Sequence, residues 1–481
     1  MVQTHGALIF LAGDIALKMK RAVRYDYMDL STLDLRQALL RRELDLNKPV
    51  APEIYQDVVP VTRTKDGGLE LGGQGEPIEW VLRMWRFPKE NELALIAESG
   101  GIDDDLARDL GTAIFSYHAQ SAKRSCDGAR LIGDILDELD RVFADMKEQL
   151  GAPNINQFHH KSRAMLARVA PVLCRRADAG HVRRCHGDLH LRNIVLLDGK
   201  PVPFDALEFD EVLGTCDVLY DLAFLIMDLR HRDLGRAANM VLNSYLLSAS
   251  GLEDEGLAAL PLFLAVRAAI RAMVLVQTAT ATGTTVNPEA VQFLNDALIS
   301  LQPPDPRLVL VGGLSGTGKT AVSRALAPLI GGPSGAVHLR TDLERKMIHT
   351  SEVNLGVPSD EYSVASRKAV YDRMFSRAGA ILSAGHSVLL DATFLDANLR
   401  TSAQNLAKAA DVACDALWLE APLSVLIDRV KARQGDASDA DEHVVRKQLK
   451  SGGPPSDWQR ISAEGSLEET VEAAQAAVKR A

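Results

Sequence analysis

Short runs of alternating apolar and polar residues open the chain and predict a small antiparallel sheet. Two runs flank the Gly13-Asp14 turn and form a candidate hairpin, and two later runs flank a glycine-rich turn. Between these pairs, leucines recur at helical spacing after Ser31-Thr32, which predicts an amphipathic helix that ends near Asn47. The four candidate strands are residues 7–12, 15–19, 58–62 and 79–84.

The pattern from residue 89 to residue 301 is helical, apart from hairpins expected between residues 185 and 210. The most apolar part, residues 257–276, is interrupted by a proline and two arginines. A membrane span needs an almost uncharged run of about 20 residues, so this stretch predicts a buried helix or a pair of helices.

Residues 301–306 contain three prolines within four positions, and this composition favours a stiff linker. Beyond it, strands and helices alternate, which predicts a parallel sheet that binds ligand at the carboxyl ends of its strands. The candidate strands are 307–311, 337–340, 387–391 and 416–419. We therefore expect a strand-rich lobe (1–88), a helical lobe (89–300), the linker (301–306) and an α/β domain (307–481).

Composition narrows the class of protein. At 481 residues the chain is too long for one ordinary core, and its 47% hydrophobic and 25% charged residues are typical of a folded globular protein. A net charge of −10 argues against a broad nucleic-acid surface. Five scattered cysteines and no signal-peptide pattern favour a cytoplasmic protein with reduced thiols and no membrane partner. The sequence predicts no particular oligomeric state.

Residues 185–205 carry the first candidate chemical centre. Asp188, an asparagine five positions later and Asp205 lie beside short apolar runs. Phosphoryl transfer needs a group that accepts the acceptor hydroxyl's proton and ligands for a metal that neutralises phosphate charge. We assign the first role to Asp188 and Mg²⁺ binding to Asn193 and Asp205, with Asp221 capping its helix or tying the loop through hydrogen bonds.

A strand lysine and a helix glutamate complete this set as expectations. Lys18 ends an apolar strand and is the candidate for binding ATP phosphates, and Glu43 on the following helix is the candidate that holds it. Both also suit a solvated surface, and Arg83 competes weakly for the phosphate role. Glu53 and Glu92 are weaker alternatives to Glu43.

The stretch from His186 to Asn193, followed by Phe204-Asp205, resembles the catalytic loop of the aminoglycoside phosphotransferase and choline kinase family. Gly187 stands where protein kinases carry arginine. The resemblance implies a bilobal α+β fold of the protein-kinase type. Only six residues precede the first candidate strand, so we expect the glycine-rich hairpin over the phosphates to be truncated or missing. Thr4, His5 and Gly6 are its candidate remnant.

The second candidate centre is a complete G-x-x-x-x-G-K-[ST] motif, which lies between a predicted strand and a predicted helix. In such a loop, backbone N–H groups surround phosphates at a helix N-terminus, the lysine reaches the terminal phosphates, and the threonine binds Mg²⁺. The motif predicts an ATP site formed by Gly313, Ser315, Gly316, Thr317, Gly318, Lys319 and Thr320.

Polar residues at the ends of the following strands and on a later helix extend this site. Asp342 lies where small P-loop kinases hold an aspartate that orients the acceptor hydroxyl or the metal, and Asp391 is the candidate metal carboxylate. Arg429 and Arg433 share a helix face and would clamp the transferred phosphate, or else line a solvated face.

The C-terminal region resembles the P-loop kinases that include polynucleotide 5′-kinase, gluconate kinase and zeta toxins. The whole chain resembles bacterial fusions of a phosphotransferase-like and a P-loop kinase-like domain. The expected function is an ATP- and Mg²⁺-dependent phosphotransferase with two centres and small hydroxylated acceptors. Two alternatives stay open. The N-terminal region would be an inactive module that binds a ligand and regulates the P-loop kinase, or the P-loop domain would phosphorylate nucleic-acid 5′-hydroxyls.

Overall fold

A computed structural model describes residues 1–3, 6–25, 28–353, 364–432, 442–451 and 453–478 of the chain. The fold divides into two compact units, each formed from two stretches of sequence. The first contains residues 1–135 and 173–232, and the second contains residues 136–172 and 233–481.

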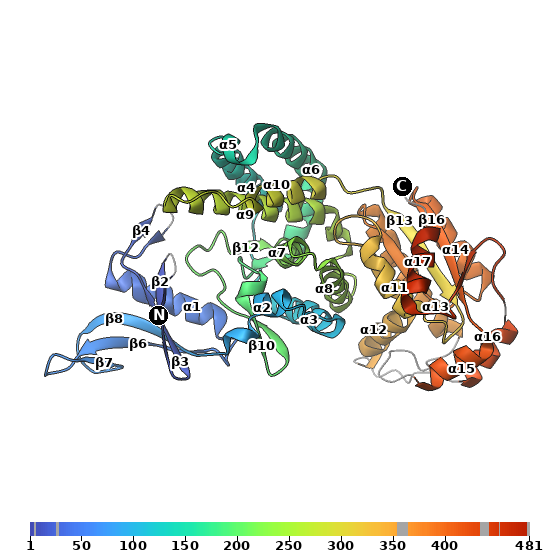
Figure 1. Cartoon of the computed structure of the whole chain (residues 1–481), viewed down its shortest axis with the longest axis horizontal. Helices are drawn as coiled ribbons and strands as arrows, with labels where there is room; N and C mark the ends of the chain where they lie inside the picture. The colour runs from blue at the N-terminus through green and yellow to red at the C-terminus, as the bar shows by residue number, and fades with distance from the viewer. Residues whose placement is uncertain (4–5, 26–27, 354–363, 433–441, 452, 479–481) are drawn as a thin grey trace. The chain divides into compact units, whose positions relative to one another are not determined.

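The first unit opens with a six-stranded antiparallel sheet in the order β1-β2-β3-β8-β6-β7 (Figure 1). Its strands are β1 (Val2–Gln3), β2 (Ala7–Ala12), β3 (Ile15–Lys20), β6 (Tyr55–Arg63), β7 (Leu69–Leu71) and β8 (Pro77–Trp85). The short pair β4 (Arg24–Tyr25) and β5 (Met28–Asp29) lies outside this sheet. The hairpin expected around Gly13-Asp14 is present as β2 and β3.

Helix α1 (Leu33–Asn47) packs against β6 and β8. The side chain of Thr32 caps it by accepting the Leu35 N–H, as the Ser31-Thr32 start signal suggests. Its apolar face joins a core around Leu40, Tyr55 and Leu82. This packing fixes the helix face that carries Glu43 against the sheet.

Strand β1 pairs with β2 through Val2–Ile9 and Gln3–Leu8. A two-residue strand therefore precedes β2, in the place where the sequence suggests a truncated hairpin. Thr4 and His5, candidates for the turn of that hairpin, lie outside the described residues.

Two short antiparallel pairs, β9–β12 and β10–β11, hold the central loops of the first unit. Helix α7 follows β12 and is almost wholly buried, which explains its continuous apolar sequence. The elements here are η1 (Lys89–Asn91), α2 (Leu93–Glu98), α3 (Asp104–Gln120), β9 (Val182–Arg184), η2 (Leu191–Asn193), β10 (Ile194–Leu197), β11 (Lys200–Pro203), β12 (Thr215–Asp217) and α7 (Val218–His231).

The remaining helices before the linker are α4 (Gly128–Phe143), α5 (Lys147–Leu150), α6 (Ala152–Ala179), α8 (Gly235–Ser248), η3 (Asp254–Ala259), α9 (Leu260–Thr282) and α10 (Glu289–Ser300). The segment Asp254–Thr282 passes a test of length and composition for a membrane span, but its most apolar window is 67% buried. The core helix of a folded domain meets the same test. Helix α9 is mostly buried, in agreement with the buried helix or pair of helices that the interrupted apolar pattern predicts.

The second unit contains a five-stranded parallel sheet in the order β14-β15-β13-β16-β17. Figure 1 labels two of these strands, β13 and β16. The strands are β13 (Arg307–Gly313), β14 (Val337–Arg340), β15 (Val388–Asp391), β16 (Ala413–Glu420) and β17 (Gln459–Ser462). Every residue of β13 and β15 is buried, as expected for central strands covered on both faces.

Helices follow the strands of this sheet, as the alternating pattern predicts. They are α11 (Lys319–Leu326), η4 (Ala327–Leu329), α12 (Thr341–Val353), α13 (Val364–Ser383), α14 (Ala397–Ala409), α15 (Leu423–Ala432), α16 (Glu442–Ser451) and α17 (Leu467–Ala477). Because all five strands run parallel, the loop after β13 and the ends of β14 and β15 meet at one edge.

Candidate functional site

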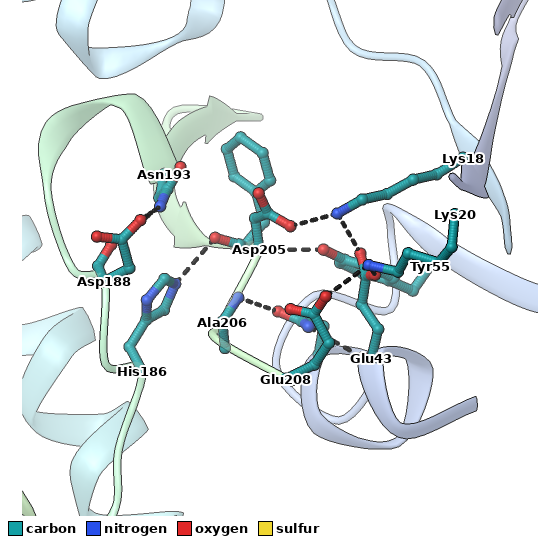
Figure 2. Close-up of polar contacts among 12 residues, drawn as sticks. Lys18, Lys20, Glu43, Tyr55, His186, Asp188, Asn193, Asp205, Ala206 and Glu208 are labelled. Atoms are coloured by element: carbon teal, nitrogen blue, oxygen red, sulfur yellow. Dashed lines mark hydrogen bonds and ion pairs between the residues drawn. The ribbon is translucent and has the colours of Figure 1, made fainter. Parts of the chain in front are cut away.

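Five charged side chains form a largely buried cluster in the first unit (Figure 2). The Lys18 Nζ atom lies 2.6 Å from Glu43 Oε1 and 2.7 Å from Asp205 Oδ1. The Lys20 Nζ atom lies 2.7 Å from Glu43 Oε2 and 2.5 Å from Glu208 Oε1. Two lysines therefore share one fully buried glutamate, and each also binds a carboxylate from the segment after β11.

Strand and helix geometry explains why these groups converge. Lys18 and Lys20 are two positions apart on β3, so both point to the same face of the sheet. The Asp205 backbone has a φ of 60°, in the left-handed region. Its N–H donates to the Tyr55 hydroxyl at 2.9 Å, and the next N–H donates to Asn47 Oδ1 at 2.8 Å. These bonds tie the Asp205 segment to β6 and α1.

The charges set the protonation states of the cluster. Burial lowers the pKa of Lys18, but Asp205 and Glu43 outweigh it and hold that pKa well above its ordinary value. Desolvation opposes ionisation of Asp205, yet Lys18 keeps the pKa of this carboxyl below its usual range. For Glu208, burial followed by the nearby Glu43 raises the pKa. Lys18 and Asp205 are therefore charged at neutral pH.

The loop from His186 to Asn193 is bound to helix α7 through hydrogen bonds. The Asp221 carboxylate accepts the N–H groups of His186 at 3.0 Å and Gly187 at 2.9 Å, so this residue ties the loop, one of the two roles expected for it. The Asn193 side chain donates from Nδ2 to the Asp188 carbonyl and to Asp188 Oδ2, both at 2.9 Å. The loop thus fixes Asp188 and Asn193 side by side (Figure 2).

The His186 ring braces the same loop. Its Nε2 atom lies 2.9 Å from the Phe204 carbonyl, which joins the loop to the residue before Asp205. Burial lowers the pKa of this imidazole, so it is neutral at pH 7 and donates through Nε2. Gly187 has a φ of 84°, a conformation that glycine adopts without strain.

The weaker sequence candidates lie elsewhere. Arg83 on β8 is paired with Asp57 on β6 at 2.6 Å, and both side chains are at least one-third exposed. Glu92 stands at the N-terminus of α2. Of the candidates for the lysine–glutamate pair, the structure joins Lys18 to Glu43.

The donor set of this centre suits Mg²⁺, a hard cation that prefers oxygen ligands. The two hydrogen bonds of the Asn193 side chain use Nδ2 and leave its amide oxygen for a cation. The Asp205 side chain is 42% exposed, and its bond to Lys18 uses one of two carboxylate oxygens. Both predicted ligands are therefore chemically able to hold the ion.

The second unit presents the phosphate loop between β13 and α11. Gly313, Gly316 and Gly318 have φ values of 140°, 87° and 83°. A Cβ atom on Gly313 would lie 2.5 Å from the Leu419 carbonyl oxygen, and one on Gly316 would lie 2.6 Å from that of Leu426. Only glycine fits at these two positions, and the loop leads into the N-terminus of α11, the end of a helix that attracts anions.

Lysine, threonine and aspartate converge beside this loop. Lys319 Nζ donates to the Leu314 carbonyl at 2.9 Å, and Thr320 Oγ1 donates to Asp391 Oδ2 at 2.7 Å. His338 and Arg340 on the neighbouring strand β14 lie 3.5 and 3.6 Å from the same Asp391 oxygen.

Electrostatics keeps this aspartate ionised. Burial alone raises the pKa of Asp391, but the nearby His338 ring and the charge of Lys319 outweigh it and lower the pKa to about 2. A threonine hydroxyl and an ionised carboxylate form an oxygen donor pair that suits Mg²⁺.

The other predicted residues of this centre lie on helices. Asp342, in the first turn of α12, binds Arg345 at 3.2 Å. Arg429 on α15 donates to the Ala463 carbonyl at 2.8 Å. Arg433 lies outside the described residues.

Three residues of the two centres escaped the sequence interpretation. Gln448 on α16 accepts the Ser315 N–H at 2.8 Å and donates to Ser315 Oγ at 3.1 Å. Lys20 and Glu208 belong to the first cluster. The i, i+2 spacing of Lys18 and Lys20 was a usable signal for the second lysine, whereas Glu208 and Gln448 had no local one.

Comparison with known families identifies both regions. Residues 35–260 match the model of the phosphotransferase enzyme family, and residues 308–455 match the AAA domain model. The chain thus has a phosphotransferase-family domain followed by a P-loop kinase-like domain, as its motifs predict, and it is a kinase-type enzyme.

Similar proteins are known by sequence over the whole length. Uncharacterized proteins of Mycobacterium bovis and Mycobacterium tuberculosis are each 29% identical over 484 aligned positions, which cover 98% of this chain and 93% of theirs. Among solved structures, a gluconokinase from Sinorhizobium meliloti is 20% identical over 36% of this chain and 91% of its own, with a TM-score of 0.28. The APS kinase of Mycobacterium tuberculosis is 18% identical over 37% and 99%, also with a TM-score of 0.28.

Proposed function

We propose that the protein is an ATP- and Mg²⁺-dependent phosphotransferase with two kinase-type centres, each transferring the γ-phosphate to a small hydroxylated acceptor. The observation that carries this proposal is that candidate phosphoryl-transfer residues converge in each compact unit, around Lys18 and Asp205 in the first and around Thr320 and Asp391 in the second. The net charge of −10 supports small-molecule acceptors rather than nucleic acid. Five free thiols support a cytoplasmic enzyme.

In the first centre, Asp188 accepts the proton of the acceptor hydroxyl as that oxygen attacks the γ-phosphorus and the bond to the β-phosphate oxygen breaks. Lys18, oriented by Glu43, binds the phosphates of ATP. Asn193 and Asp205 would hold Mg²⁺, which neutralises charge on the phosphate oxygens.

In the second centre, the loop N–H groups and Lys319 bind the phosphates of a second ATP. Thr320 and Asp391 would hold its Mg²⁺, while Asp342 orients the acceptor hydroxyl. Arg429 and Arg433 remain candidates for a phosphate clamp from α15 and the segment after it. The ionised state of Asp391 supports its role as a metal ligand.

Single variants of the full chain test the two-centre proposal. Phosphoryl transfer from ATP is measured against a panel of sugars, amino alcohols and other hydroxylated metabolites. We expect Asp188→Asn to abolish transfer to one set of acceptors and Lys319→Met to abolish transfer to another. Loss of a general base lowers rates by roughly 10²–10⁴-fold. Asp134→Asn and Lys408→Met, at exposed helical positions, are the matched controls.

The same experiment addresses the regulatory alternative. If Lys319→Met removes all transfer and Asp188→Asn removes none, the first centre is not an enzyme. Oligonucleotides with free 5′-hydroxyls belong in the panel, since their labelling would contradict small acceptors for the P-loop centre.

A further inference from the structure

A buried ion-pair network in the second unit links the P-loop domain to the region before the linker. Glu344 on α12 is 1% exposed, and its two oxygens accept bonds from Arg377 Nη1 at 2.6 Å and Arg373 Nε at 2.7 Å. Arg377 also donates to both carboxylate oxygens of Asp254 on η3, at 2.8 and 3.0 Å. Arg373 donates to the carbonyl and hydroxyl of Ser250 at 3.0 and 2.8 Å.

Two features separate this network from an ordinary surface pair. It contains two arginines and two carboxylates, so its formal charge is balanced without solvent. Asp254 and Arg377 are 2% and 6% exposed and form a planar two-bond pair, which has one preferred geometry. A buried ion pair is weak evidence for net stability, so our hypothesis is that this network serves to fix the arrangement of its elements.

The element that this network fixes is the helix that carries Asp342. Glu344 lies two positions further along α12, so the two side chains point about 200° apart around the helix axis. Clamping Glu344 therefore sets the rotation of the helix and the direction of Asp342. Helix α12 begins directly after Arg340, whose strand position pairs with Asp391. A rotation of α12 moves Asp342 relative to that carboxylate.

We propose that Glu344, Arg377 and Asp254 are positioning residues for the P-loop centre. Through them, η3 sets the orientation of the helix that bears Asp342. Asp254 lies within the residues that match the phosphotransferase family and outside those that match the AAA domain. The active geometry of the second centre thus depends on a residue from the first family region. This inference rests on the proposed role of Asp342.

The test uses the full chain with Asp188→Asn in the background, so that the first centre is silent. The probe is Mg²⁺·ATP alone, with water as the acceptor, and kcat and KM for ATP hydrolysis are measured. Asp254→Asn is expected to lower kcat by about 10–100-fold, because misplacement of a reacting group by about 1 Å costs up to this factor. KM for ATP stays unchanged, since Gly313–Thr320 is untouched. Hydrogen exchange of residues 341–348 is expected to become faster.

A matched control removes a different buried ion pair of the second unit, one that lies within the parallel sheet. Arg307 and Asp415 lie 3.2 Å apart, near the amino ends of β13 and β16 and far along the strands from the phosphate loop. Asp415→Asn is expected to lower thermal stability without changing kcat. If a general loss of stability were the cause, kcat would fall in both variants. A positioning role lowers kcat only in Asp254→Asn.

Two further variants make each outcome decisive. If Asp342→Asn leaves kcat unchanged, the proposed role of Asp342 is wrong. If it lowers kcat while Asp254→Asn does not, the positioning proposal is overturned and the function stands. Should Asp254→Asn lose ATP binding through misfolding, Arg377→Lys replaces it, because it keeps the charge and loses the two-bond geometry. Unchanged kcat in Arg377→Lys then refutes the proposal.

Discussion

Replacing Glu43 with glutamine tests whether the lysine cluster behaves as a buried ionic unit. The substitution keeps the side-chain shape but removes the one anion shared by Lys18 and Lys20, at 2.6 and 2.7 Å. Removing one partner of a buried pair costs roughly 3–5 kcal/mol. Each lysine keeps a second carboxylate, so we expect the lower end, about 3 kcal/mol. That corresponds to roughly 150-fold faster hydrogen exchange where exchange requires opening of the cluster.

Exchange is measured by mass spectrometry on peptides from α1 and β8, which avoids assuming that the two units unfold together. Asp57→Asn is the matched control, since its pair with Arg83 is 2.6 Å long but has side chains 34% and 44% exposed. Exposed pairs contribute less than about 1 kcal/mol. If Glu43→Gln changes exchange by less than fivefold, as we expect for the control, solvent screens the cluster and our description of it as buried and ionic is wrong.

Three further predictions concern the second unit. Gly316→Ala is expected to weaken Mg²⁺·ATP binding at least tenfold, because the φ of 87° and a carbonyl oxygen 2.6 Å from the new methyl group would distort the loop. Gly453→Ala is the control, since its methyl group would enter open space and is expected to leave binding unchanged. Calorimetric titration measures the affinity of both variants. Gln448→Leu removes two bonds that preorganise Ser315 and is expected to weaken ATP binding by about 5–10-fold, and tighter binding would contradict this role. Burial lowers the pKa of His386 to about 4, below its unfolded value near 6.5. The neutral ring therefore contributes about 3 kcal/mol to the free energy of unfolding above pH 6.5, and this contribution disappears as the pH falls to 4. His386→Asn should flatten that part of the stability–pH curve, measured by thermal unfolding, and an unchanged slope would show that another group titrates there.

Local pattern was enough for the elements that carry most of the chemistry. The phosphate loop is a single motif between a strand and a helix, so sequence alone predicts its place and the two elements that flank it. The pairing of Lys18 with Glu43 also follows from order along the chain, since the resembling family supplies a helix glutamate after the lysine strand. Helix α7 was recognisable because the residues from Leu219 to Leu229 are strongly periodic.

Contacts between distant segments were beyond this reasoning. Glu208 meets Lys20 across 188 residues, and Asp254 meets Arg377 across 123. A charged residue has the same local pattern whether it faces water or a buried partner, so sequence position alone does not separate the two. The strands β9, β12 and β17 were missed for a related reason. Each has three or four residues, too few for alternation to be distinguished from chance.

The two centres consequently differ in what disables them. The first is assembled from side chains on β3, α1, the 186–193 loop and the Asp205 segment, and opposite charges hold these parts together. We therefore expect the removal of a single charge to disorganise it. The second depends on backbone N–H groups and glycine conformations within eight residues, so adding one methyl group is more damaging than removing a distant charge. Asp254 is the exception that we propose, because it acts on the acceptor side through α12 and leaves the phosphate side intact. A loss of kcat without a loss of ATP affinity is thus the signature that separates this network from both the loop and the fold.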